Sequence, residues 1–244
     1  MDYRLLLTVR YKPRGTHPPF TMLLIFAAFA FLLSAANLPS VFPAPAVWLP
    51  SGAQVLDKDD QLFWDKKFSD PKMGFSREPS RLLVNAIRGR KPGTAIDLGM
   101  GEGRNAIFLA QQGWQVTGVD LSDVAIAQAK AHAAKAGVKI NAVLDGLDHC
   151  DLGRNQWDLI ILFYTHAWYN GARRQSAQRM RDALKPGGLL VIEGFAGNED
   201  YLFHPNELLR DFPELRVMFY EDTQGEAEWA PGRQSHVIRF VGEK

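Results

Sequence analysis

Cysteine is almost absent from this chain of 244 residues, in which Cys150 is the only one. A single thiol excludes an internal disulfide framework and indicates a reducing compartment, so a packed core has to stabilise the fold. Net charge is nearly absent as well, because 28 basic residues balance 27 acidic ones. This balance gives no reason to expect nucleic acid as a partner. The six histidines lack metal-ligand spacing with cysteine or carboxylate, so we expect no metal site.

Long apolar runs are rare, and the longest lies near the start of the chain. Basic residues precede an uncharged stretch over 15–56, within which 20–33 is almost wholly apolar and small residues follow at 34–36. This order fits a signal peptide, or a short membrane anchor through residues 20–36. Prolines between 39 and 50 then indicate an extended linker. We therefore divide the chain into a signal-like or anchoring segment with a linker, 1–56, and a domain, 57–244.

A glycine-rich stretch, Asp97-Leu98-Gly99-Met100-Gly101-Glu102-Gly103, follows a short apolar run and precedes a helical pattern. A strand, a tight turn and a helix start in this order form a cradle for a nucleotide cofactor. Glycine permits positive φ angles and close approach of a ligand, and the helix start adds free N–H groups. The dinucleotide spacing G-x-G-x-x-G would need glycine where Arg104 stands. About twenty residues on, Asp120 ends a second strand, at the position that binds ribose hydroxyls.

Strand and helix patterns alternate through most of the domain. This alternation predicts an α/β fold with a doubly wound, mostly parallel sheet. Two strand-like runs near the end of the chain have no room for a helix between them, so they predict an antiparallel hairpin. The expected strands are 94–97, 115–120, 139–144, 157–164, 189–195, 215–221 and 235–241, and the expected helices are 80–90, 105–112, 122–136 and 173–184.

Three landmarks together resemble class I S-adenosylmethionine-dependent methyltransferases: residues 95–106, Asp120, and the run 184–192 that contains Lys185-Pro186-Gly187-Gly188. The segment 63–79 is similar to small bacterial members of the tellurite-resistance and thiopurine type. The resemblance implies a Rossmann-like sheet of seven strands completed by the C-terminal hairpin, with S-adenosylmethionine as the cofactor. It also implies that the segment before the first strand packs over the cofactor and helps to close the substrate pocket.

The carboxyl ends of the strands should gather the cofactor-binding residues in one crevice. By the resemblance, Asp97 and Gly99 face the amino-acid end of the cofactor, and Asp120 with Leu121 contacts the ribose and adenine. Asp145 and Gly146 match the contact to the adenine amino group, with Asp148 as a close rival. The full predicted set is Asp97, Gly99, Gly101, Gly103, Asn105, Asp120, Leu121, Asp145, Gly146 and Phe163.

An aromatic stretch at 163–169 is the predicted wall of the substrate pocket, because aromatic rings suit a small apolar or polarisable acceptor. The predicted pocket residues are Trp64, Tyr164, Trp168 and Tyr169, although the last two could simply pack against the next helix. Methyl transfer mainly requires alignment of the reacting atoms. An oxygen or nitrogen acceptor could use a base, for which His166 and Glu193 are candidates, whereas a thiol or selenol needs none.

We predict S-adenosylmethionine-dependent methyl transfer to a small molecule by in-line displacement. Two alternatives stay open: a non-catalytic cofactor-binding module, and a nicotinamide-dependent oxidoreductase, which the glycine spacing disfavours. A basic segment before an apolar run stays in the cytoplasm, so the domain after it would be exported, away from a cytosolic cofactor. We therefore expect a cytoplasmic domain that is membrane-anchored or has a start placed too far upstream, while secretion is a third interpretation.

Overall fold

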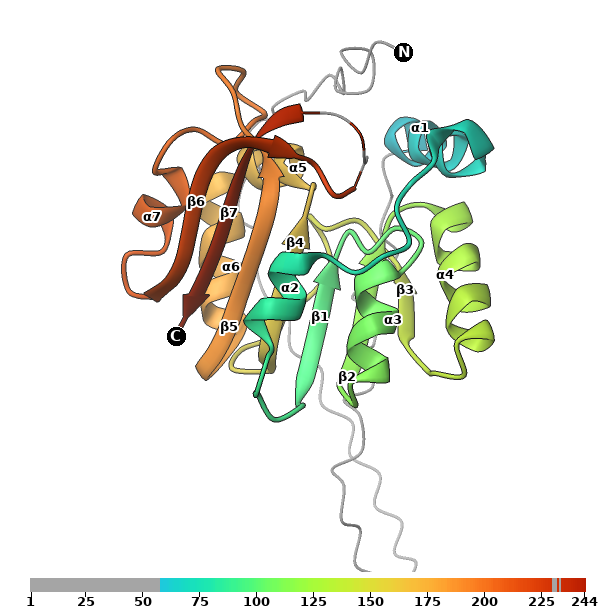
Figure 1. Ribbon diagram of the computed structural model, residues 1–244, viewed down its shortest axis with the longest axis horizontal. Coiled ribbons are helices and arrows are strands. Elements are labelled where there is room, and N and C mark those ends of the chain that lie inside the picture. The colour runs from blue at the N-terminus through green and yellow to red at the C-terminus, as the bar shows by residue number, and fades with distance from the viewer. Residues whose placement is uncertain (1–57, 230–231, 233) are drawn as a thin grey trace, which may run out of the picture. The chain divides into compact units, whose positions relative to one another are not determined.

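A seven-stranded sheet is the centre of the computed structural model, which describes residues 58–229, 232 and 234–244 (Figure 1). Its strand order is β3-β2-β1-β4-β5-β7-β6. The first five strands in this order are parallel, and β7 pairs antiparallel with both β5 and β6. The strands are β1 Thr94–Leu98, β2 Gln115–Asp120, β3 Asn141–Leu144, β4 Trp157–Phe163, β5 Leu184–Phe195, β6 Arg216–Glu226 and β7 Gln234–Glu243. The predicted fold class and the C-terminal hairpin are confirmed.

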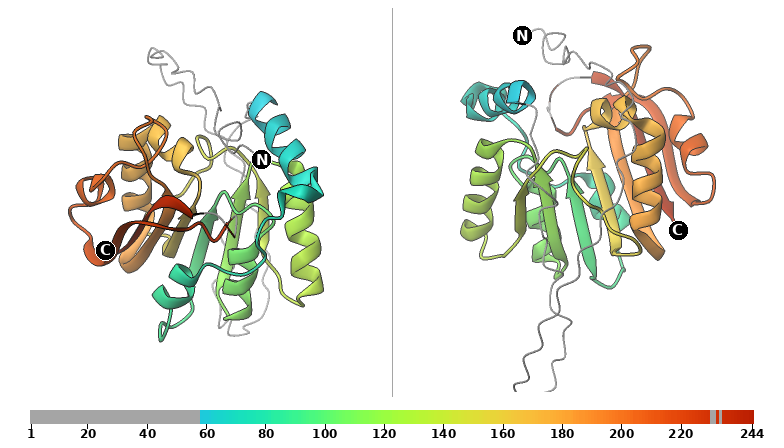
Figure 2. Two further views of the ribbon diagram at one scale, coloured as in Figure 1. Left: turned by 45° about the horizontal axis from the view of Figure 1, so that its top comes forward. Right: turned by 180° about the vertical axis from the view of Figure 1, so that it is seen from behind.

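Helices cover both faces of this sheet, which buries apolar side chains on each side. Helices α2 and α3 lie in front of the sheet in Figure 1, and α6 crosses its other face, as the right-hand view of Figure 2 shows. Strand β4 is central and buried along almost its whole length, as its run of apolar residues predicts. The α-helices are α1 Lys58–Ser69, α2 Arg81–Ala86, α3 Arg104–Gln111, α4 Asp123–Lys135, α5 His166–Gly171, α6 Arg173–Ala183 and α7 Glu207–Asp211.

The start of α4 is the best-defined helix boundary. The Ser122 hydroxyl accepts the N–H of Ala125 at 3.1 Å, which is the N-cap that the sequence predicts. Gly137, with φ of 70°, follows the last turn of α4. Asp65 on α1 accepts hydrogen bonds from the Ser122 hydroxyl and the Val124 N–H. This carboxylate therefore fastens α1 to the beginning of α4 (Figure 1).

Several elements differ from the sequence prediction. The helix expected over 80–90 ends at Ala86, because the chain turns at Gly89, whose φ is 75°, and Pro92 follows soon after. Strand β5 begins at Leu184 rather than at residue 189, since Trp157 pairs with Leu184 before an irregularity in the register. A short 3₁₀ turn at Pro71–Met73 and the helices α1, α5 and α7 were not predicted.

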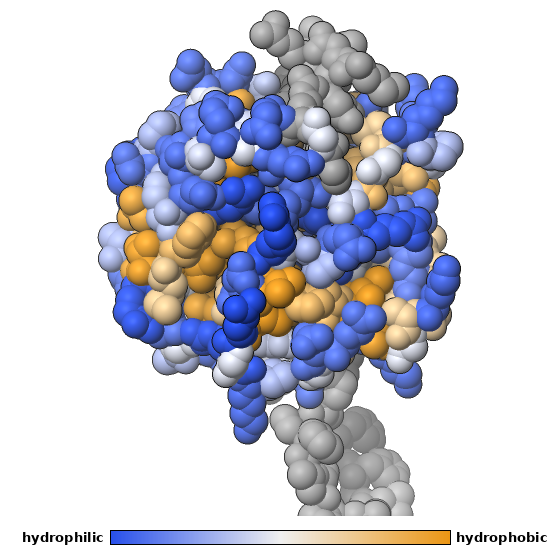
Figure 3. Space-filling view, viewed as in Figure 1, coloured by the Kyte–Doolittle hydropathy of each residue, from blue (hydrophilic) through white to orange (hydrophobic). Residues whose placement is uncertain are grey.

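The outer strand β6 leaves apolar side chains on the surface. Val217, Met218 and Phe219 are each more than two-fifths exposed. Figure 3 shows apolar surface on the side of the molecule where β6 lies in Figure 1. None of these three residues belongs to the predicted site, so Phe219 serves below as a control.

The proposed membrane segment 20–36, and with it the division of the chain near residue 56, lies outside the described residues. In the part of the chain that the structure describes, every helix is too short or too polar to cross a bilayer.

Candidate active site

The glycine turn between β1 and α3 has the conformation that the sequence predicts. Gly99, Gly101 and Gly103 have φ values of 78°, 55° and 83°, which side chains rarely tolerate. A Cβ on Gly99 would lie 2.2 Å from Thr165 Cγ2, and one on Gly101 would lie 3.3 Å from the Phe68 ring. The turn therefore needs glycine both for its backbone angles and for the close approach of its neighbours.

Asp120 at the end of β2 holds this turn in place. Its Oδ2 accepts the Gly101 N–H at 2.8 Å, and its Oδ1 accepts the Ser122 N–H at 2.9 Å. Burial raises the pKa of Asp120 to about 6, although both amides favour the charged form. Each carboxylate oxygen keeps a second lone pair, so Asp120 can still accept bonds from ligand hydroxyl groups.

Asp97 and Arg104 present two unused polar atoms beside the turn. Asp97 is buried at the end of β1, and among the described residues its Oδ2 has no hydrogen-bond partner. Burial raises the pKa of Asp97 to about 7, and the nearby Arg104 charge partly opposes that rise. Nη1 of Arg104 donates to the carbonyls of Glu78 and Glu228. Nη2 of Arg104 is buried and, like Asp97 Oδ2, has no hydrogen-bond partner among the described residues. Burying a hydrogen-bond acceptor or donor without a partner costs free energy of folding, and a bound zwitterion would supply a partner to both atoms.

The loop after β3 carries the residues predicted for the adenine. The Asp145 N–H donates to the Asp120 carbonyl at 3.0 Å, which places this buried acid next to the end of β2. Burial raises the pKa of Asp145 as well. The rival Asp148 is exposed, and its Oδ1 accepts the Trp168 indole N–H at 2.8 Å. Asp145 is therefore the better candidate of the two.

Aromatic rings from four distant segments form a cluster at the end of the sheet, which we call the aromatic cluster. Its members follow one another in space, each with its ring centre 4.9–6.0 Å from the next. In this spatial order they are Trp64, Phe68, Phe75, Trp229, Tyr164 and Phe195. Trp64 and Tyr164 were predicted pocket residues, and the other four were not. Trp229 stands out in the sequence as a lone aromatic residue in a polar hairpin loop, and that signal could have identified it.

Tyr164, which follows β4, connects the aromatic cluster to a buried ion pair. Its φ of 60° is rare for a bulky residue, and its N–H donates to the Glu193 carbonyl at 2.7 Å. The Tyr164 hydroxyl donates to Oε1 of Glu193, and Nε of Arg239 lies 3.1 Å from Oε2. Burial raises the pKa of both Glu193 and Tyr164, while Arg239 opposes the rise at each. Backbone strain held by such a network is typical of functional sites.

Two predicted roles do not fit their surroundings. Tyr169 is fully buried between Phe203 and Phe212, and its hydroxyl donates to Asp211, so it belongs to the core under α7 and its assignment to the substrate pocket is wrong. His166 packs against the rings of Phe195 and Phe203.

Burial explains why His166 is a poor base. It lowers the pKa of the imidazole to about 4, and neither ring nitrogen has a hydrogen-bond partner among the described residues. This surrounding favours a packing role.

Three further predicted residues lie in structural contacts. Asn105 is buried, and its Oδ1 accepts the Ser80 N–H at 2.9 Å, which joins the starts of α2 and α3. Trp168 bonds Asp148 and packs against Arg179 rather than against the aromatic cluster. Phe163 is part of the hydrophobic core. These contacts account for all three residues without a ligand.

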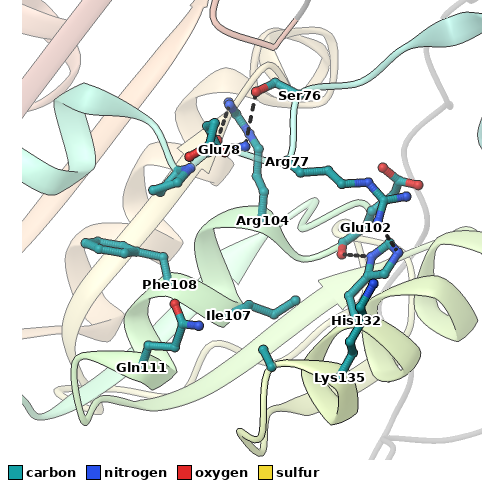
Figure 4. Close-up of a pocket in the computed structure, with 12 residues that line it drawn as sticks. Ser76, Arg77, Glu78, Glu102, Arg104, Ile107, Phe108, Gln111, His132 and Lys135 are labelled. Atoms are coloured by element: carbon teal, nitrogen blue, oxygen red, sulfur yellow. Dashed lines mark hydrogen bonds between the residues drawn. The ribbon is translucent and has the colours of Figure 1, made fainter.

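A cavity of about 330 Å³ opens on the outer side of the glycine turn, between residues 76–79 and helices α3 and α4 (Figure 4). Nη1 of Arg77 lies 2.8 Å from Nε2 of His132, whose Nδ1 faces the Glu102 carbonyl. None of the residues that the sequence analysis assigned to the cofactor lines this cavity, but Arg104 does, so the cavity adjoins the glycine turn at the start of α3.

Known proteins resemble this chain in sequence. A family described as a methyltransferase domain matches residues 95–188. A carboxy-S-adenosyl-L-methionine synthase from Aeromonas salmonicida is 30% identical over 125 residues, which cover 49% of this chain and 51% of that protein. The probable S-adenosyl-L-methionine-dependent methyltransferase TehB from Haemophilus influenzae is 25% identical over 153 residues, or 59% and 53% of the two chains. The chain thus spans about half the length of these curated relatives.

Solved structures share the fold. TehB from Haemophilus influenzae superposes with a TM-score of 0.60 at 19% identity, covering 75% of this chain and 66% of TehB. A Burkholderia thailandensis 1,6-didemethyltoxoflavin-N1-methyltransferase, with 1,6-didemethyltoxoflavin and S-adenosylhomocysteine bound, superposes with a TM-score of 0.59 at 17% identity. The superposition covers 77% of this chain and 86% of that one. This chain therefore shares its fold with a solved methyltransferase structure. Its residues 95–188 match a methyltransferase domain, and a relative described as a probable S-adenosyl-L-methionine-dependent methyltransferase matches it in sequence, which bears out the resemblance.

Proposed function

We propose that the protein transfers a methyl group from S-adenosylmethionine to a small-molecule acceptor. The observation that carries this proposal is the pair of unsatisfied buried atoms, Asp97 Oδ2 and Arg104 Nη2, beside the glycine turn. The amino-acid end of the cofactor has an ammonium and a carboxylate, and these charges complement the two atoms. Asp120 would accept the ribose hydroxyls, and Asp145 with Gly146 would face the adenine.

The acceptor would lie against the aromatic cluster. When bound, the cofactor would supply a methyl group on a sulfonium. A lone pair of the acceptor atom would form the new bond to the methyl carbon, while the C–S bonding pair stays on sulfur and gives a neutral thioether. The protein has to orient the acceptor and exclude water, and rings that enclose the site do both. If the acceptor is a hydroxyl or an N–H group, its proton can pass to the Tyr164 oxygen as the Tyr164 hydroxyl gives its own proton to the Glu193 carboxylate. Glu193 is therefore the better supported of the two base candidates, acting through Tyr164.

The proposal is tested by titrating the full chain with S-adenosylmethionine, S-adenosylhomocysteine and NAD in a calorimeter. We expect micromolar binding of the first two compounds and none of NAD. Absence of binding by the sulfonium and thioether pair would refute the proposal. Turnover with a panel of thiols, phenols and amines then separates an enzyme from a non-catalytic binding module.

Asp120→Ala provides a test of the ribose contact. The change removes a carboxylate that we expect to accept hydroxyl groups, so S-adenosylhomocysteine should bind more weakly by about 1.5–3 kcal/mol. Asp123→Ala is the matched control, because Asp123 is exposed three residues further along the chain. Equal affinities of the two variants, both folded by circular dichroism, would contradict the assignment.

Binding of the cofactor should release a proton from Asp97. In the free protein its pKa is about 7, so at pH 6.5 the carboxyl is mostly protonated. A bound ammonium favours the charged form, so a proton should leave as the cofactor binds at this pH. Calorimetry in two buffers of different ionisation enthalpy measures the release. Asp97→Asn should abolish it, and an unchanged release in that variant would assign the proton elsewhere.

The same carboxyl should affect the stability of the free protein. Its folded pKa is raised above the unfolded value, so between about pH 4 and 7 the folded state holds a proton that the unfolded state has lost. The contribution of Asp97 to stability is therefore present at low pH and is lost as the pH rises through 7.

A further inference from the structure

Trp229 occupies an unusual place in the aromatic cluster. Its indole is nearly parallel to two other rings, at 4.9 Å and 19° from Phe75 and at 5.7 Å and 23° from Tyr164. Phe195 meets the indole edge-on at 6.4 Å. These are the preferred geometries of aromatic contacts. The protein therefore offers a place where one flat ring stacks on two others and touches the edge of a third.

This place is continuous with the glycine turn on two sides. Tyr164 is followed by Thr165, whose methyl group packs against Gly99. On the other side Phe75 contacts Phe68, and the Phe68 ring lies against Gly101. A flat molecule that replaced the indole would thus lie next to the residues that we propose for the cofactor.

The main chain around Trp229 is fastened independently of its side chain. The Trp229 carbonyl accepts the Ser76 N–H at 3.3 Å, and the preceding Glu228 carboxylate accepts both the N–H and the Nε of Arg81. Arg104 donates to the Glu228 carbonyl. The indole itself is half-buried and makes ring contacts with Phe75, Tyr164 and Phe195. Each such contact adds only about 0.5–1.5 kcal/mol beyond the burial of the rings, and none of these backbone hydrogen bonds involves the indole, so the side chain can rotate away while the backbone stays in place.

We propose that the methyl acceptor is a planar aromatic molecule and that the Trp229 indole occupies the acceptor's position when no acceptor is bound. This inference rests on the proposed function. The acceptor ring stacks on Phe75 and Tyr164, and a hydroxyl or ring N–H at its edge reaches the Tyr164–Glu193 pair. A compact or saturated acceptor would leave these ring faces uncovered. The aromatic cluster therefore selects a flat acceptor over one that is not flat.

The test compares two ligands of similar size, each with one hydroxyl group: 2-naphthol, which is flat, and decahydro-2-naphthol, which is not. The full chain is saturated with S-adenosylhomocysteine and titrated with each in a calorimeter. We expect 2-naphthol to bind at least tenfold more tightly. Equal affinities, or binding of neither compound, would overturn the inference while leaving the cofactor proposal intact. Failure of S-adenosylhomocysteine to bind would instead contradict the proposed function, and the two alcohols would then be compared without it.

Variants show whether the Trp229 indole is displaced by the acceptor or is a permanent wall of the pocket. Trp229→Ala removes the competing ring, so 2-naphthol should bind at least threefold more tightly, whereas weaker binding would show that the indole is a wall of the pocket. Phe75→Leu removes a stacking partner and should weaken binding by at least fivefold. The matched control is Phe219→Leu on the exposed face of β6, for which we expect no change. S-adenosylhomocysteine affinity should be the same in all three.

Discussion

Arg104→Met should weaken the binding of S-adenosylhomocysteine by about 3 kcal/mol, or about 150-fold. The guanidinium lies at the first residue of α3, and its Nη2 is the one buried donor near Asp97 that lacks a partner among the described residues. A charge-assisted bond to the ligand carboxylate is the interaction that the variant loses. Titration calorimetry of the variant and the native protein measures the difference.

A ligand without the amino-acid end shows where that loss arises. Because 5′-methylthioadenosine keeps the ribose, the adenine and the thioether, its affinity should be nearly the same in both proteins. Arg77→Met is the matched control, since Arg77 is exposed and contacts His132 on the outer side of the turn. If Arg104→Met weakened both ligands equally, Arg104 would act by holding the turn through the carbonyls of Glu78 and Glu228 and not by binding the carboxylate.

Arg239→Met should lower the free energy of unfolding by about 3–5 kcal/mol, because it leaves the Glu193 charge buried without its partner. The Glu193 side chain is 0% exposed, and that of Arg239 is 14% exposed. The second partner of Arg239, Glu221, is 39% exposed and can be solvated when the arginine is removed. Urea unfolding followed by circular dichroism measures the loss.

The loss should depend on pH in a defined direction. Burial already raises the pKa of Glu193, and removal of Arg239 raises it further. The folded variant then holds a proton that the unfolded chain has released, so its stability falls as the pH rises above the ordinary pKa of a glutamate.

Two further variants check the cause of this loss. Adding Glu193→Gln to Arg239→Met removes the buried charge and should restore most of the stability. Arg216→Met breaks an exposed pair with Glu243, so it should change the stability by less than about 1 kcal/mol. A loss of the same size for Arg216→Met and Arg239→Met, or no recovery in the double variant, would refute the buried-charge explanation.

The architecture was predictable because its signals are local. Glycine spacing, the acid at the end of the second strand and the Ser122 cap each specify a short segment, and alternation of strands and helices then leaves few topologies. The grouping of Asp97, Asp120 and Asp145 was predictable for the same reason, since the ends of parallel strands meet at one edge of the sheet. The predicted helix at 80–90 was too long because a glycine turn overrode the apolar spacing.

The remainder of the site depends on side-chain direction and on distant segments. Tyr164 and Tyr169 are close in the sequence, but Tyr169 lies on α5, which directs its side chain into the core beneath α7. Phe75 and Trp229 are separated by most of the domain, and only the folded chain stacks them. Arg104 was noted solely as the residue that breaks the dinucleotide spacing, because a sequence does not show which buried donors lack partners.

The place of β7 in the sheet has a consequence for the order in which the protein assembles. It is the last of the described strands along the chain, yet it lies between β5 and β6. Until it docks, the edge of β5 is unpaired and Glu193 lacks Arg239. Strand β6, which pairs only with β7 among the described strands, also has no place in the sheet before that step. A ribosome that has made β1 to β6 therefore holds a chain whose acceptor site does not yet exist, and insertion of one strand completes the sheet and the site together.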